Sequence, residues 1–285
     1  MYPLFNYILP VFNKEDILPL TLAGIDKCAG ERSRIFAIID GCTDKSEQVV
    51  DAFAKKSGRQ IEKIHMPNVH MLRSVNAGLR QVTEGFSIIM QDDIVLEDTE
   101  IERKLENLYT KMGPRLGVVS FRLASNVRKN SFYNSLRSKT LNAMIEECDF
   151  IQGPDDNQNY QVGEYESFYP RISAINGPNC IPWTVLSKVG LFDEHLAPYG
   201  YDDPEYCLRA INNGFINGLY PMKYKSDIEW GGTRRNKKFR KEAFLIHKRN
   251  RQYVWKKHNG IISLLENNPR LKASVKVEKL DFELI

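Results

Sequence analysis

The stretch "SIIMQDDIVLED", Ser87 to Asp98, places two adjacent carboxylates where an apolar run ends. Ile88 to Met90 are typical of a buried strand, and Gln91, Asp92 and Asp93 follow them directly. Charged side chains are seldom buried without a partner, because desolvating them costs several kcal/mol or more. We therefore expect a positively charged group beside Asp92 and Asp93.

The chain on the N-terminal side of this stretch alternates between strand-like and helix-like segments. The patterns predict strands at 5–12, 34–40, 61–67 and 86–93, and helices at 14–30, 46–58 and 70–85. This alternation predicts an α/β fold with a parallel sheet and helices on both faces. Ligands of such sheets bind at the carboxyl ends of the strands. Three polar clusters fall at these ends, at 10–15, 40–44 and 91–93.

The second half of the chain is less uniform. Residues 124–175 are rich in Asn, Ser, Tyr and Asp, and we interpret them as an insertion or loop region that shapes a pocket; a surface excursion without a role is the alternative. Residues 202–214 predict a helix with Pro204 in its first turn and Gly214 at its end. The strongly basic segment 234–258 fits either a solvated helical face or a site for phosphates or an anionic membrane.

Composition excludes several classes of function. Forty Lys and Arg against 36 Asp and Glu give a net charge of only +4 in 285 residues, so charge gives no argument for nucleic-acid binding. Five scattered cysteines favour reduced thiols in a cytoplasmic protein over a disulfide framework or zinc site. No stretch approaches the roughly 18 apolar residues of a membrane span. We expect a soluble protein, at most peripheral on a membrane.

Each acidic cluster has a structural and a functional interpretation. Asp92 and Asp93 could hold a hard divalent cation, or they could be solvated loop residues. Asp40 could accept a hydrogen bond from a nucleotide base, or it could simply start a turn with Gly41. Asp203 could be a general base, or a carboxylate that the helix dipole stabilises. Since no constellation of His with Ser or Cys accompanies these clusters, they favour chemistry on a phosphorylated substrate over acyl transfer.

Four segments together resemble the family 2 glycosyltransferases, which have the GT-A fold. "YILPVFNKEDILPLTLAGI" is similar to the family's opening IPVYN segment, and "IIDGCTDKS" to its DDGSTD turn. "VNAGLRQVTEGFSIIMQDDIVLED" resembles the stretch that ends in the DXD motif, and "VGLFDEHLAPYGYDDPEYCLRAINNGF" resembles the acceptor-side motif. The four lie in the family's order over residues 5–221.

The resemblance implies a role for individual residues. The nucleotide-sugar site would comprise Pro10, Phe12, Asn13, Glu15, Asp40, Asn76, Gln91, Asp92 and Arg234. Asp93 would coordinate Mn²⁺ or Mg²⁺, and Asp203 would be the general base. Gln91 stands where the family often has Asp or Asn, and "DIEWGGTRR" lacks the His that many members use as a metal ligand. Glu229 could replace that His, or Arg234 and Arg235 could neutralise the leaving diphosphate.

We therefore predict a GT-A type fold with a mostly parallel, Rossmann-like sheet. Residues 1–122 would form the nucleotide-sugar-binding half, 123–225 the acceptor-binding half and 226–285 a C-terminal helical extension. The predicted activity is inverting transfer from a UDP-sugar or similar donor to a glycan or lipid-linked acceptor, in surface polysaccharide synthesis. The alternatives are a sugar nucleotidyltransferase, whose Gly-rich phosphate loop is missing from "LPVFNKED", and a non-catalytic carbohydrate- or nucleotide-binding protein.

Overall fold

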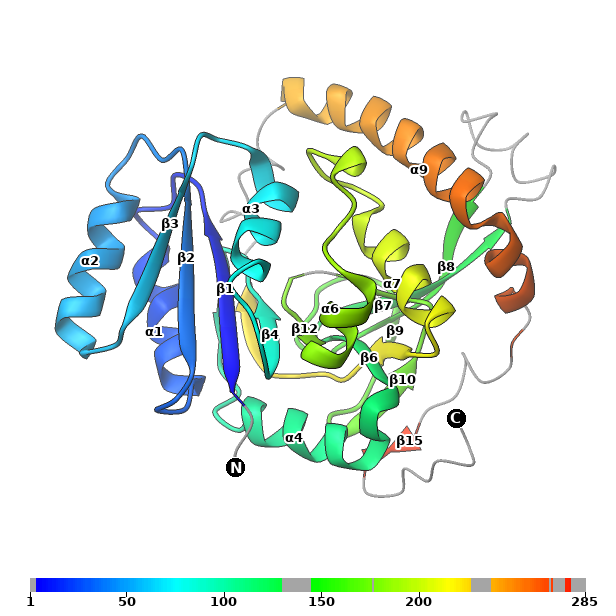
Figure 1. Ribbon diagram of the computed structural model, residues 1–285, viewed down its shortest axis with the longest axis horizontal. Helices are drawn as coiled ribbons and strands as arrows, with labels where there is room; N and C mark the ends of the chain where they lie inside the picture. Colours follow the sequence, from blue (N-terminus) through cyan, green and yellow to red (C-terminus); the bar gives the residue numbers. More distant parts are fainter. Residues whose placement is uncertain are drawn as a thin grey trace.

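A nine-stranded sheet forms the centre of the computed structural model, which describes residues 4–129, 145–175, 177–226, 237–266, 268 and 275–277. Its strand order is β15-β10-β13-β6-β12-β4-β1-β2-β3 (Figure 1). The bounds are β1 (Phe5–Val11), β2 (Arg34–Asp40), β3 (Ile61–Met66), β4 (Phe86–Ile89), β6 (Leu116–Ser120), β10 (Ser167–Pro170), β12 (Asn179–Pro182), β13 (Ile216–Leu219) and β15 (Val275–Lys276).

Most of these strands point the same way. β1 pairs in parallel with β2 and β4, β2 with β3, and β13 with β6. β12 is antiparallel to both β4 and β6, so β6 and β13 run in the direction of β4. The mostly parallel α/β sheet predicted from the sequence is confirmed.

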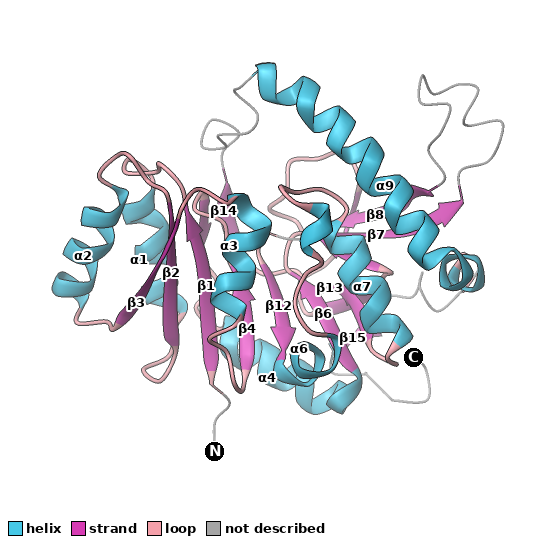
Figure 2. Cartoon of the chain, turned by 45° about the horizontal axis from the view of Figure 1, so that its top comes forward, coloured by secondary structure: helices cyan, strands magenta, loops and turns pink. Residues whose placement is uncertain are grey.

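Helices cover both faces of the sheet, and each face has its own apolar core. Phe5, Tyr7 and Leu9 of β1 pack into the core that also holds residues of α1 (Leu18–Cys28) and α4 (Ile101–Met112). Ile8 points the other way, into the core shared with α3 (His70–Leu79) and α7 (Asp202–Asn212). Side chains alternate between the two faces of a strand, and all of β1 is buried because both faces are covered. α2 (Ser46–Ser57) and α6 (Trp183–Val189) complete the layers, with α3, α6 and α7 in front in Figure 2.

The expectation of an irregular region at 124–175 is wrong for most of the residues described there. β7 (Leu123–Lys129), β8 (Ile145–Gln152), β9 (Gln161–Val162) and β11 (Ser173–Ile175) form a second sheet, in the order β11-β7-β8-β9. Its polar side chains pair across the strands, as Asn126 Nδ2 does with Asp149 Oδ2 at 2.9 Å. These internal polar pairs remove the alternation of apolar and polar residues that marks a strand in sequence. A short pair, β5 (Ile94–Leu96) with β14 (Tyr224–Ser226), follows the acidic stretch.

The long helix α9 (Lys237–Leu265) lies across the second half of the chain and contacts α7, β7 and β8 (Figure 1). A buried ion-pair network joins it to α7. Glu205 is fully buried and lies 2.9 Å from Arg209 Nη2, 2.8 Å from Lys257 Nζ and 3.2 Å from His258 Nε2. Burial acts to raise the pKa of Glu205, but hydrogen bonds from His258 and Arg209 outweigh it and lower the pKa to about 2. No helix in the described ranges is both long and apolar enough to cross a membrane.

Candidate active site

Three strand ends meet at one edge of the sheet. Val11 of β1 lies in register with Ile39 of β2, and Ile8 of β1 with Ile89 of β4. The residues that follow these strands therefore gather together. The Phe12 backbone N–H donates to Asp92 Oδ2 at 2.9 Å, which ties the first loop to the acidic stretch. The predicted meeting of the three polar clusters is thus present in the structure.

The loops after β1 and β2 are joined by side-chain to backbone hydrogen bonds. Asn13 Oδ1 accepts from the Thr43 N–H at 2.8 Å, and Glu15 Oε2 accepts from the Lys45 N–H at 2.8 Å. Two predicted pocket residues, Asn13 and Glu15, therefore brace the loops. Pro10 is buried within β1, whereas the Phe12 ring is 43% exposed at the rim. Phe12 therefore presents an apolar side chain that is open to a ligand.

Asp40 lies at the end of β2 and is only 3% exposed. Its Oδ1 accepts from the Val69 N–H at 2.6 Å, so the carboxylate fixes the segment that leads into α3. Gly41 has a φ of +67°, and a Cβ there would lie 2.7 Å from the Asn68 nitrogen. His70 has a φ of +66°, in the left-handed region that only a few per cent of non-glycine residues adopt. Asp40 therefore holds a strained segment beside the strand ends.

Lys14 is the positively charged partner expected beside the two carboxylates. Its Nζ lies 3.8 Å from Asp92 Oδ1 and 3.8 Å from Asp93 Oδ2. Burial raises the pKa of Asp92 to about 7, although Lys14 and the Phe12 N–H act to lower it. The sequence interpretation missed Lys14, since nothing in "FNKED" indicates that its side chain turns toward residues so distant in the chain.

A second cation, Arg122, forms an ion pair after β6 and interacts with Asp93 only at longer range. Arg122 follows β6 and lies 2.6 Å from Asp156 Oδ2 through its Nε, with both side chains largely buried. Burial acts to lower the pKa of the Arg122 guanidinium, but Asp156 outweighs it, with Asp93 among the more distant charges that also raise the pKa. No pattern in the sequence indicates this ion pair of Arg122.

Gln91 and Asn76 serve as contacts between segments. A Cβ on Gly177 would lie 2.3 Å from Gln91 Oε1, so the Gln91 amide packs directly on the Gly177 backbone. Asn76 is fully buried; its Nδ2 donates to Phe192 O at 2.9 Å and its Oδ1 accepts from the Phe192 N–H at 3.0 Å. This arrangement favours positioning of the "GLFDE" loop over the nucleotide contact that the resemblance implies for Asn76.

Asp203 lies in the first turn of α7, and the topology places that turn at the edge described above. α7 leads through a short turn into β13, so the helix runs opposite to this strand. Because β13 is parallel to β6, the start of α7 lies at the carboxyl ends of the parallel strands. Asp202 Oδ1 accepts from the Gly200 N–H at 2.8 Å and so holds the loop that enters the helix.

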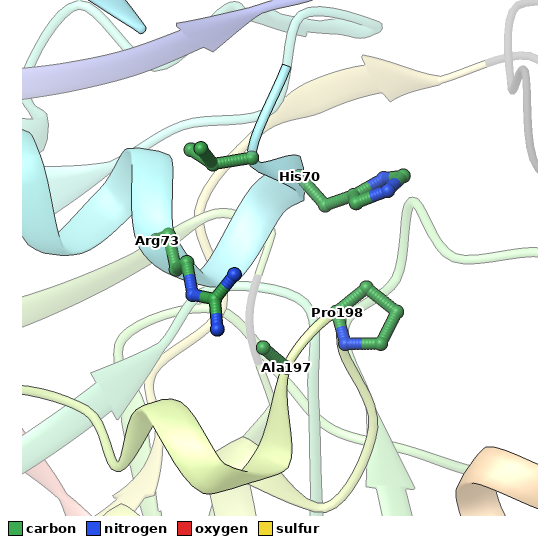
Figure 3. A pocket seen from close by; sticks show the side chains of 5 residues that line it. His70, Arg73, Ala197 and Pro198 are labelled. Atoms are coloured by element: carbon green, nitrogen blue, oxygen red, sulfur yellow. The ribbon is translucent and has the colours of Figure 1, made fainter. Parts of the chain in front are cut away.

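A pocket of about 200 Å³ joins the two halves of this edge. Val69, His70 and Arg73 line it from the start of α3, and Ala197 and Pro198 from the loop before α7. Figure 3 shows the His70 ring opposite the Pro198 ring, with the Arg73 guanidinium pointing toward Ala197. The Val69 N–H is hydrogen-bonded to Asp40. The pocket therefore lies between the segment that Asp40 holds and the segment that leads to Asp203.

The carboxylate oxygens of Asp92 and Asp93 only partly fit a bound divalent cation. Carboxylate oxygens are suitable ligands, but these two already share the Lys14 ammonium. Within the described ranges, no group of three or more His, Cys, Asp or Glu side chains is arranged to hold a metal ion. Glu229 and Arg234, which the resemblance adds to the site, lie outside the described residues. The residues described here fit a singly charged ammonium better than a divalent ion.

Comparison with solved structures places this fold among glycosyltransferases. The mannosyltransferase PcManGT from Pyrobaculum calidifontis, solved with GDP-Man and Mn²⁺, is 16% identical at a TM-score of 0.53; the match covers 78% of this chain and 55% of that one. S. aureus TarS 1-349 is 14% identical at a TM-score of 0.54, covering 94% of this chain and 75% of that one. TarS 1-349 with UDP-GlcNAc has a TM-score of 0.51 at 14% identity, covering 94% and 76%. At these identities the likeness shows the fold alone.

The sequence itself matches the family model described as "Glycosyl transferase family 2" over residues 7–168. No curated protein sequence matches the chain. The matched segment includes β1 to β4, the acidic stretch and the first strands of the second sheet. Because this segment is more than half of the 285 residues, the protein belongs to glycosyl transferase family 2.

Proposed function

We propose that the protein is an inverting glycosyltransferase that moves a sugar from a nucleoside-diphosphate sugar to a hydroxyl group. The observation that carries the proposal is the convergence at one sheet edge of Asp40, the Asp92–Asp93 pair and the first turn of α7. A sugar nucleotide has a base, a diphosphate and an anomeric carbon in a row. The site offers an acceptor for the base, charged groups for the diphosphate and a carboxylate for the attacking hydroxyl.

Each part of the site has one task in this reaction. The buried Asp40 would accept a hydrogen bond from the base. Asp203 would take the proton of the acceptor hydroxyl while its oxygen forms the new bond to the anomeric carbon. The bond between that carbon and the diphosphate oxygen breaks, and the diphosphate leaves with the electron pair. Attack from the face opposite the leaving group inverts the anomeric centre.

The leaving diphosphate needs positive charge beside it. The resemblance predicts Mn²⁺ or Mg²⁺ held by Asp93 and Glu229, and a bound cation of this kind would stabilise the charge on the diphosphate. Lys14 is the protein cation that the structure describes beside the carboxylates.

The substrates are proposed from the relatives and the composition. Solved relatives were crystallised with GDP-Man or UDP-GlcNAc, which supports a nucleotide-sugar donor, and we favour a UDP-sugar. We propose a glycan or lipid-linked acceptor and a role in polysaccharide synthesis at the cytoplasmic face of a membrane. The exposed Phe244 and Leu245 of α9, in a strongly basic segment, support peripheral contact with that surface.

The second candidate function is nucleotide-sugar binding without catalysis. The observation that favours it is Gln91, an amide packed against Gly177 where the family often has an acid. Both candidate functions predict that the protein binds the donor, but only the glycosyltransferase would turn it over.

The first experiment is a thermal-shift screen of nucleotides and nucleotide sugars, since a ligand that binds only the native state raises the melting temperature. Nucleotide release from the selected donor then measures turnover. We expect Asp203→Asn to keep the donor-induced shift and lose about 10²–10⁴ in rate, the usual contribution of a general base.

Asp202→Asn is the matched control, because an Asn side chain can still accept from the Gly200 N–H. Its turnover should stay within about threefold of wild type. Unchanged turnover in Asp203→Asn would reject the role of this residue. Binding of donor with no turnover under any condition would favour the non-catalytic candidate.

A further inference from the structure

The loop after β1 holds Lys14 rigidly against both acidic residues. Its backbone N–H donates to Ser46 Oγ at 2.8 Å, and the neighbouring Phe12 N–H donates to Asp92 Oδ2 at 2.9 Å. The Lys14 side chain is 13% exposed, and those of Asp92 and Asp93 are 17% and 21% exposed. The Lys14 backbone is thus anchored, and its side chain lies beside both carboxylates, largely shielded from solvent.

One ammonium between two carboxylates changes what this position can bind. It offsets part of the negative charge of the pair, so the pair attracts a divalent cation less strongly than two unpartnered carboxylates would. A metal ion bound to either carboxylate would also lie near the ammonium, and the two cations would repel each other. Both effects lower the affinity of Asp92 and Asp93 for a metal.

The remaining donors near the pair do not compensate for this loss. Gln91 offers an amide in place of a carboxylate, and it packs on Gly177. The part of the chain that the structure describes has no third His, Cys, Asp or Glu arranged with these two for metal binding.

We propose that Lys14 is the built-in cation of the donor site and binds the diphosphate of the sugar nucleotide directly, so that donor binding does not require a divalent metal. The inference rests on the proposed function, because it assumes a nucleoside-diphosphate ligand. An ammonium has three N–H donors, which suit phosphate oxygens. Asp92 and Asp93 then hold the ammonium in place.

The test is isothermal titration calorimetry with UDP and GDP, each in EDTA and in Mn²⁺. Wild-type protein should bind one of them in EDTA with an affinity within about threefold of that in Mn²⁺. Lys14→Gln should lose about tenfold or more in EDTA and regain part of the loss in Mn²⁺, since the freed carboxylates can then accept the metal. Lys14→Arg should retain binding in EDTA, because it keeps the positive charge.

Lys45→Gln is the matched control: it removes the same charge from an exposed position on the neighbouring loop and should bind like wild type. Circular dichroism establishes that each variant is folded. Wild-type binding that appears only with Mn²⁺, or equal binding by Lys14→Gln in EDTA, overturns the inference and leaves the proposed function intact. Absence of UDP and GDP binding under both conditions overturns the two together.

Discussion

Replacing Asn250 with Ala tests how α9 supports the segment that carries Asp203. Asn250 is 1% exposed, and its Nδ2 donates to three backbone carbonyls of the loop before α7. The acceptors are Leu196 O at 2.8 Å, Tyr199 O at 3.1 Å and Gly200 O at 2.8 Å. A primary amide has two N–H groups, so the three carbonyls share two protons.

The geometry sets the size of the effect. A buried hydrogen bond contributes about 0.5–1.5 kcal/mol, and an acceptor left buried without a donor costs about 1–3 kcal/mol. Asn250→Ala removes both N–H groups of the amide, and water can partly enter the space that the side chain leaves. We therefore expect the free energy of unfolding to fall by roughly 2–4 kcal/mol. At about 2–4 °C per kcal/mol for a domain of this size, the melting temperature should fall by roughly 4–16 °C.

Urea unfolding followed by far-ultraviolet circular dichroism measures the free energy change. Asn259→Ala is the control, because Asn259 is exposed on the same helix and should change the free energy by less than about 0.5 kcal/mol. Under conditions where the variant stays folded, Asn250→Ala should also lower turnover more than it weakens donor binding, since the loop leads into Asp202 and Asp203. A loss below about 0.5 kcal/mol would show that these contacts do not hold the loop and would refute the reasoning.

Three further predictions follow from single contacts. Glu205 has a folded pKa of about 2, below its ordinary value near 4.3. Its charge therefore stabilises the fold above about pH 5 and stops doing so as the pH falls toward 2, and Glu205→Gln should flatten the dependence of unfolding free energy on pH over this range. Gly177→Ala would place a Cβ 2.3 Å from Gln91 Oε1, so the end of the Gln91 side chain must move off the Gly177 backbone. Both Gly177 (φ +91°) and Gly190 (φ +82°, open space) adopt a conformation that strains alanine, so both substitutions should destabilise the protein in urea, Gly177→Ala slightly more; no loss of stability in either variant would contradict the backbone strain. Asp40→Ala should weaken UDP or GDP binding about tenfold or more by calorimetry, because a buried acceptor is lost; unaltered binding would remove Asp40 from the nucleotide site.

Local sequence patterns were sufficient to predict strands and helices of the central sheet and its layers. The strand predicted at 34–40 is β2, and the helix predicted at 46–58 is α2, which ends at Gly58 with a φ of +73°. Both depend on neighbouring residues: apolar runs, helical spacing and a glycine that adopts the left-handed conformation at a helix end. The polar residues of β7 and β8 are bonded to each other across strands, and there the same patterns failed.

The sequence by itself determined that acidic residues follow β2 and β4 and begin α7, because strand and helix ends can be located from short segments. Only the tertiary structure decided what lies beside them. Lys14 reaches Asp92 and Asp93 because β1 and β4 are neighbours in the sheet, and Val69 reaches Asp40 because β2 and β3 pair with Asp40 beside Met66. Such contacts depend on how distant strands pair, and no local pattern of residues records that pairing.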